Sequence, residues 1–198
     1  MLTVCQNVTD YVGLAQPTAV IGQTTRDARR LQAAVRQTVK ELLNLGFPDL
    51  MRAHTFTTVA SQDLYDEPSD LHRYISDTFW TSNRRFAAGP INPQLWQRLE
   101  QNGTVTVDPI HRLKQSESGT IQRQFEIYPV PNSVYTLNVL YYSNQPFKDT
   151  LGTTRKTDWT ADTDEGIIEE YMIELGVIWR MLRSMRRDYR SEEHTSEL

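Results

Sequence analysis

The side chains that could do chemistry in this 198-residue sequence are few and scattered. The single cysteine, Cys5, has no base near it in sequence and falls on the apolar side of a predicted helix. We therefore interpret it as a small buried hydrophobic residue. One cysteine also excludes an internal disulfide framework and a multi-cysteine zinc site. His72 has no partner histidine at metal-ligand spacing, and we interpret it as a structural or surface histidine; His111 falls alone on a predicted strand.

An acidic segment, SQDLYDEPSD (residues 61–70), offers the carboxylates that a hard cation prefers: Asp63, Asp66, Glu67 and Asp70. It lacks the glycine and the alternating oxygen ligands of a calcium-binding loop, so we do not predict a metal site there. The sequence also contains no GxGxxG, GxxxxGKS/T, HExxH, CxxC or GxSxG motif. We therefore predict no catalytic residue, no metal ligand, no cofactor and no enzymatic activity.

Two amphipathic helices are predicted near the N-terminus, over residues 2–14 and 24–46. The apolar side of the first consists of Leu2, Cys5, Val8, Tyr11 and Val12. The second is predicted to begin at Thr24, to end at Gly46 and to bury Ala28, Leu31, Val35, Val39 and Leu42. Its basic residues lie off that stripe and form either a solvated face or a surface for an acidic partner or DNA: Arg26, Arg29, Arg30, Arg36 and Lys40.

A third, longer helix is predicted from Asp164 to Tyr189, with Asp162 as its cap and Glu165 completing a capping box. It would be about 39 Å long at 1.5 Å per residue. Its predicted apolar stripe is Ile167, Ile168, Tyr171, Met172, Leu175, Ile178, Trp179, Leu182 and Met185. This stripe must be covered by the first two helices or by another subunit. Acidic residues in the first half and basic residues in the second complement the helix dipole and suit head-to-tail neighbours.

Between the helices, residues 55–150 have the alternating pattern of β-strands. We predict strands at 55–60, at 109–114 and in TIQRQFEIYP and SVYTLNVLYYS, the last two joined as a hairpin at Pro131-Asn132-Ser133. A turn is predicted at Ser82-Asn83, a second turn at 116–119, a short helix at 93–102 and a polar connector at 143–163. Tyr135 and Tyr141 share one strand face that could stack nucleic-acid bases, although core or subunit interface is the preferred interpretation.

The predicted fold class is thus α+β. A helical bundle forms from the N-terminal helix pair (1–46) and the long C-terminal helix (163–189), with a central antiparallel β region. No apolar run reaches the roughly 18 to 20 residues of a membrane helix, and no secretory signal is evident, so we expect synthesis in the cytoplasm and no membrane association. The formal charge of −4 disfavours broad, non-specific duplex binding.

The last nine residues, RSEEHTSEL (190–198), have no apolar periodicity. They match the in-frame translation of a common sequencing-library adapter at every position. We interpret them as an artefact and exclude them from the fold, which leaves a single predicted domain over residues 1–189.

The segment DTFWTSNRRFAAGPINPQLWQRL resembles part of the phage head–tail adaptor (connector) proteins of tailed bacterial viruses. The similarity rests on Asp77, Thr78, Phe79, Trp80, Arg84, Arg85, Gly89, Pro90 and Trp96. FEIYPVPNSVYTLNVLYYS is similar to the family's strand–Pro–x–Pro–strand, and EEYMIELGVIWRMLRSMRRDY to its closing helix, with Leu175, Gly176 and Trp179 in register. The order of these pieces is more specific than any one of them.

The resemblance implies a structural virion protein at the head–tail junction, made in the host cytoplasm. Such adaptors form a ring, generally of twelve copies, beneath the portal. The ring extends the DNA channel and docks tail or nozzle proteins, and genomic DNA passes through it without sequence-specific binding. Two alternatives stay open: another ring or scaffold subunit, and a nucleic-acid-binding module that uses Arg26, Arg29, Arg30 and the tyrosine face.

Overall fold

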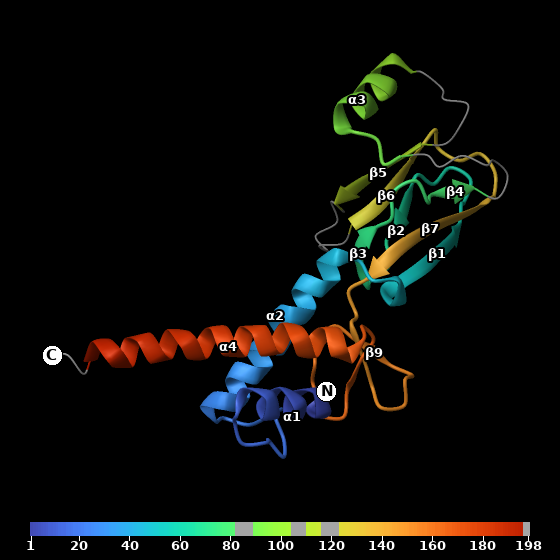
Figure 1. Cartoon of the computed structure of the whole chain (residues 1–198). Helices are drawn as coiled ribbons and strands as arrows, with labels where there is room; N and C mark the ends of the chain where they lie inside the picture. Colours follow the sequence, from blue (N-terminus) through green and yellow to red (C-terminus); the bar gives the residue numbers. More distant parts are fainter. Residues whose placement is uncertain (82–88, 104–109, 116–122, 196–198) are drawn as a thin grey trace. The chain divides into compact units, whose positions relative to one another are not determined.

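The computed structural model describes the backbone of residues 1–81, 89–103, 110–115 and 123–195; side chains are described for the same residues up to 185, Gln115 excepted. The fold is α+β with antiparallel sheets, which confirms the predicted class (Figure 1). The chain forms two compact units. Unit 1 contains Met1–Leu50 and Asn144–Leu198, and unit 2 contains Met51–Ser143.

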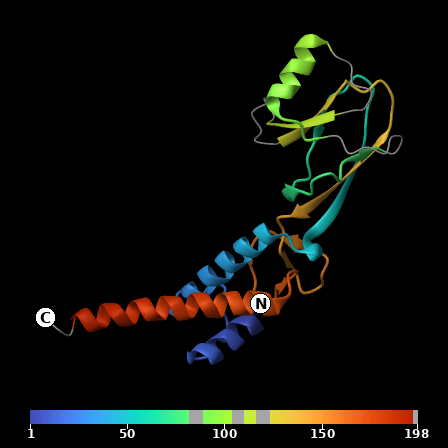
Figure 2. The same ribbon diagram turned by 45° about the horizontal axis from the view of Figure 1, so that its top comes forward.

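Unit 1 is built on three helices: α1 (Leu2–Val12), α2 (Arg26–Leu45) and α4 (Glu170–Thr195). Both α1 and α2 pack against α4 (Figures 1 and 2). A short 3-10 helix, η1 (Pro48–Leu50), follows α2. None of the described helices combines the length and the apolar character that a bilayer crossing demands.

The predicted apolar stripe of α2 is confirmed, because all five of its residues are buried. The cap is displaced by one position from the prediction. Thr25 precedes the helix, and its Oγ1 accepts a hydrogen bond from the Ala28 amide at 3.4 Å. In α1, Cys5 and Val8 are buried as predicted, but Tyr11 is exposed and Val4 is buried instead.

Both predicted bounds of the long helix are wrong, since α4 begins at Glu170 and continues to Thr195, into the segment that was predicted to lie outside the fold. The two aspartates expected at its start bind other backbone groups. The Asp162 carboxylate accepts hydrogen bonds from the amides of Val20 (3.1 Å) and Ile21 (3.0 Å). The Asp164 carboxylate accepts from the amides of residues 160 and 161 at 3.0 and 2.9 Å, so neither caps a helix.

The polar connector predicted at 143–163 is also wrong, because part of it is a small folded sheet. Strands β8 (Phe147–Lys148), β9 (Arg155–Lys156) and β10 (Glu165–Gly166) pair in the order β10-β8-β9. Phe147 and Trp159 are buried beside it in unit 1. The polar composition concealed two large apolar side chains, which supply the core that holds this segment.

Unit 2 holds two antiparallel sheets. The first contains β1 (Met51–Thr57), β7 (Thr136–Ser143) and β3 (Leu71–Tyr74) in that order, with β4 (Trp80–Thr81) also paired to β7. The second has the order β2 (Leu64–Asp66), β6 (Arg123–Tyr128) and β5 (Ile110–Gln115). The alternation predicted for the last long strand is confirmed in β7. The alternation predicted for β6 is wrong, because Glu126 is buried together with Phe125 and Ile127. The apolar cluster is Tyr65, Phe79, Phe125, Ile127, Leu137 and Val139.

The predicted hairpin between β6 and β7 is wrong, because the two strands belong to different sheets. Pro129 and Pro131 follow β6 directly and have no N–H to donate to a ladder. The carbonyls of this loop instead accept hydrogen bonds from the segment after β1. The Thr58 amide donates to Tyr135 at 2.9 Å, and the Ser61 amide donates to Pro131 at 2.8 Å.

The short helix of the β region is confirmed as α3 (Pro93–Asn102). Asn92 caps it by accepting a hydrogen bond from the Leu95 amide at 2.8 Å, and Gly103 ends it with a φ of 58°. The predicted turns at 82–83 and 116–119, and the paired arginines Arg84 and Arg85, lie outside the described residues.

Candidate interaction surface

Helix α4 has two apolar faces, and only one of them is covered within unit 1. The inner face, Ile173, Val177 and Met181, is buried. The outer face consists of exposed residues: Tyr171, Met172, Leu175, Trp179 and Leu182. Tyr171 is 59% exposed and Trp179 is 55% exposed. Most of the apolar stripe predicted from sequence is therefore this outer face. The first two helices do not cover it.

Helix geometry accounts for the two faces. Leu175 follows Ile173 by two positions, and Trp179 follows Val177 by two positions. Two positions correspond to about 200° around an α-helix, so the inner and outer sets lie on nearly opposite sides. A helix that is apolar all round is normally buried all round, so the outer face marks a surface for another molecule.

The signal that could have identified the inner face is Gly176. A Cβ at this position would lie 2.4 Å from Thr38 Cγ2, so α4 approaches α2 more closely than any larger residue would permit. Arg180 donates to Thr38 Oγ1 at 2.9 Å and forms an ion pair with Glu41 on the same side. These contacts fix which side of α4 faces α2.

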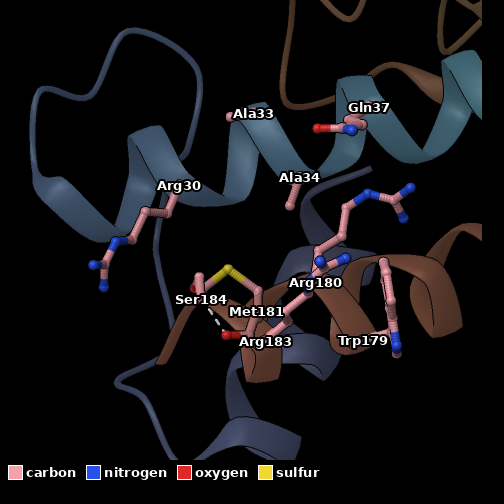
Figure 3. Close-up of a pocket in the computed structure, with 9 residues that line it drawn as sticks. All are labelled: Arg30, Ala33, Ala34, Gln37, Trp179, Arg180, Met181, Arg183 and Ser184. Carbon is pink, nitrogen blue, oxygen red and sulfur yellow. Dashed lines mark hydrogen bonds between the residues drawn. The ribbon is translucent and has the colours of Figure 1, made fainter. Parts of the chain in front are cut away.

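A groove of about 540 Å³ runs between α2 and the middle of α4 (Figure 3). We call it the basic groove, because three arginines line it: Arg30, Arg180 and Arg183. Its floor includes the buried Ala34 and Met181. Trp179 is shared with the outer face.

Trp179 is flanked by two of these cations. The guanidinium carbon of Arg183 lies 5.2 Å from the centre of the Trp179 ring system, and that of Arg180 lies 5.5 Å from it. Such contacts hold an exposed aromatic ring in place and keep positive charge beside it. The groove can therefore receive an acidic or aromatic group.

The opposite flank of α4 is acidic. Asn7 of α1 donates a hydrogen bond to Glu174 Oε2 at 3.1 Å. One turn further along α1, Asp10 and Tyr11 are exposed, and Tyr11 is 69% accessible. The α1 sequence contains no lysine or arginine. We call Asp10, Tyr11 and Glu174 the acidic edge.

Of the residues that could do chemistry, Cys5 is fully buried, as predicted. This burial raises the pKa of its thiol to about 12. His111 is buried on β5, and its ring stacks on Phe79 with the centroids 3.9 Å apart. His72 lies on β3. Cys5 belongs to unit 1, whereas His72 and His111 belong to unit 2.

Carboxylates of the acidic segment 61–70 form hydrogen bonds and ion pairs within unit 2. Asp70 accepts hydrogen bonds from the Tyr141 hydroxyl (2.8 Å), the Ser143 hydroxyl (2.8 Å) and Arg52 (2.7 Å). Burial alone would raise the pKa of Asp70, but these three donors outweigh it, and the pKa lies below its ordinary value. Glu67 pairs with Arg123 at 3.1 Å. Within the described residues, no group of three or more carboxylate, histidine or cysteine side chains is arranged to hold a metal ion.

The tyrosine-bearing strand β7 belongs to the core of unit 2, in agreement with the preferred interpretation. Tyr141 is buried and its hydroxyl donates to Asp70, and Tyr135 is partly buried against the apolar cluster of unit 2. Buried rings cannot stack on the bases of a nucleic acid. Of the basic residues on α2, Arg36 is engaged with Asp158 at 3.0 Å, whereas Arg29 and Lys40 are exposed.

The described part of the chain combines an α+β fold with an apolar helical face that its own copy leaves exposed. The model of the SU10 adaptor protein family matches residues 2–197, nearly the whole chain, and the chain belongs to this family. The predicted resemblance to phage head–tail adaptors is confirmed by this match. The protein is therefore a phage adaptor, a virion component that interacts with other virion components. No curated protein matches the chain.

Proposed function

We propose that this protein is a head–tail adaptor that forms a ring below the portal, extends the DNA channel and docks tail components. The observation that carries the proposal is the outer face of α4. Five apolar side chains are left uncovered by the helices of the same copy. An adaptor that meets neighbouring copies and a portal needs such a face, because burial of apolar surface is the main driving force for association.

The partners follow from this arrangement. One side of the ring meets the portal, the other meets tail or nozzle proteins, and twelve copies are the number that the family resemblance implies. The helices of unit 1 would form a bundle at the portal side, and the strands of unit 2 would contribute to the ring and to the tail contact. Without residues 190–198, which carry one arginine and three glutamates, the formal charge of −4 becomes −2. This mild negative charge suits a channel through which DNA slides, since a strongly basic lining would retard it.

We further propose that residues 1–189 form one adaptor domain and that residues 190–198 are not native. The proposal for the tail rests on its match to a sequencing adapter, and reading the source DNA across this junction tests it. Genomic sequence that continues through codon 198 would overturn it.

The function is tested by mixing the protein with purified portal rings and imaging the mixture by electron microscopy. We expect an additional annulus stacked on each portal ring. Leu175→Asp on the outer face should abolish the annuli, whereas Leu151→Asp, at a position that is 83% exposed and off the helix, should leave them intact. Protein that stays single and unbound in this mixture would contradict the proposal.

A further inference from the structure

We propose that copies of this chain pack head to tail, with the acidic edge of one copy seated in the basic groove of the next. The inference deepens the proposed function and rests on it, because it names the surfaces by which ring neighbours meet. The partner that occupies the basic groove is a second copy of the same chain. Charge complementarity between the edge and the groove, both of unit 1, supports this pairing.

The basic groove has the character of a receiving site. Three arginines surround a floor of small and apolar side chains, and Trp179 stands at its border with the outer face. Arg180 is already engaged by Glu41, so the cation best placed for a partner is Arg183, which is exposed and lies over the Trp179 ring. A carboxylate that approached Arg183 would meet a positioned guanidinium beside an apolar ring.

The acidic edge supplies the matching groups. Asp10 accepts a hydrogen bond from Gln16, a neutral donor that leaves the negative charge in place. Next to Asp10, the large aromatic side chain of Tyr11 is mostly exposed in the single copy. Tyrosine is among the residues that most often anchor protein interfaces, and the groove volume of about 540 Å³ is ample for its ring.

The two surfaces are available at the same time. Glu174 marks the α1 flank of α4, and Arg180 marks the α2 flank. Six residues along a helix correspond to a rotation of about 600°, so these flanks are separated by about 120° around α4. A contact between two different surfaces is heterologous, and each copy can engage a neighbour on both flanks. Heterologous contacts close into rings when the rotation between neighbours permits.

Disulfide trapping tests the pairing within portal-bound annuli. The variant that carries both Tyr11→Cys and Gln37→Cys places one thiol on the edge and one at the groove, where Gln37 is an exposed lining residue. The native Cys5 is fully buried and will not take part. After oxidation, a non-reducing gel should show a ladder of cross-linked chains. A mixture of the two single-cysteine variants should stop at dimers, and the matched control with Tyr11→Cys and Leu151→Cys should give no ladder.

Charge reversal gives a second test that needs no cross-link. Asp10→Arg and Arg183→Glu should each lower annulus formation by about tenfold or more, since each places like charges together. An equal mixture of the two variants should restore annuli, because alternating copies make every edge–groove pair complementary again.

The outcomes separate the two proposals. Annuli that form without a ladder, or a mixture that fails to restore them, would overturn the edge–groove pairing and leave the adaptor function standing. Failure of the wild-type protein to form annuli on portal rings would overturn the function and the pairing together.

Discussion

The inner and outer faces of α4 are similar in apolar character but lie in opposite environments. Ile173, Val177 and Met181 are sealed against the other helices of unit 1, whereas Leu175 and Trp179 are open to solvent. Periodicity alone cannot distinguish them, because both sets recur every three or four residues. The inner face of α4 holds the copy together, and under the proposed function its outer face contacts other molecules. Substitutions on the two faces should therefore separate stability from assembly.

The largest effect is expected on the inner face. Val177→Asp places a carboxylate in a fully buried position that provides no partner for it. We expect a loss of about 4 kcal/mol or more in the free energy of unfolding, enough to unfold unit 1. Urea denaturation followed by circular dichroism measures it. A native-like unfolding midpoint would show that this face is not the packed one.

A smaller loss is expected where buried polar contacts support the inner side of unit 1. Asp164 accepts two backbone hydrogen bonds and a contact from Lys156 Nζ at 2.6 Å, and it is 1% exposed. Asp164→Asn should cost about 2–4 kcal/mol, because it removes one partner of a buried ion pair. Glu165→Gln is the matched control: its partner is Lys148 and both side chains are accessible, so about 0.5 kcal/mol or less is expected.

The same carboxylate predicts a pH dependence. Burial would raise the pKa of Asp164, but the hydrogen bonds from Lys156 and from the amides of Thr160 and Ala161 lower it below its ordinary value. The folded state therefore binds the proton less readily than the unfolded state. Its stabilising contribution is present above the ordinary carboxyl pKa of about 3.9 and is lost as the pH falls below that value. Thermal melts between pH 6 and 3 should fall more steeply for the wild type than for Asp164→Asn.

An intermediate effect is expected at the contact between α4 and α2. Gly176→Ala would bring a methyl group within 2.4 Å of Thr38 Cγ2, and overpacking of this kind costs about 1–3 kcal/mol. Thr38 cannot turn aside easily, since its hydroxyl donates to the Ala34 carbonyl at 2.8 Å. In a Thr38→Ala background the cost of Gly176→Ala should largely disappear, because the obstructing methyl is gone. Equal costs in both backgrounds, measured in a double-mutant cycle, would refute the close approach.

The smallest effect on stability is expected on the outer face. Leu175→Asp should change the free energy of unfolding by no more than about 0.5 kcal/mol, because the side chain is already exposed in the single copy. The same variant should lose portal binding. A large destabilisation would mean that the outer face is covered within the copy, and the contrast with Val177→Asp would collapse.

Much of the fold could be predicted where a local signal determines the structure. The α2 stripe, the capped α3 helix and the alternation along β7 all follow from short-range patterns. The start of α4 could not be predicted, because Asp162 and Glu165 have the spacing of a capping box, but the Asp162 carboxylate accepts hydrogen bonds from the distant amides of Val20 and Ile21 instead. The predicted β6–β7 hairpin was wrong because two prolines follow β6 and cannot donate to a strand ladder. Pairing between strands that are far apart in sequence also cannot be recognised from a local sequence pattern.

The candidate surface was predicted only in part. The sequence indicated a long apolar helix that needed cover, and the structure determined which side lacks it. The basic groove was missed, because it joins Arg30 of α2 to Arg183 of α4, and only tertiary packing brings these residues to one surface. The acidic edge was missed for a similar reason: Tyr11 had been assigned to the apolar side of its helix, and the structure turns it outward.

The central claim is that the outer face of α4 becomes covered when the protein assembles. Hydroxyl-radical footprinting of Trp179, in the free protein and in portal-bound annuli, tests it most directly, with the buried Trp159 as an internal reference. The account predicts strong oxidation of Trp179 in the free protein, marked protection in the annuli, and a low, unchanged signal at Trp159. Equal oxidation of Trp179 in both states would contradict it.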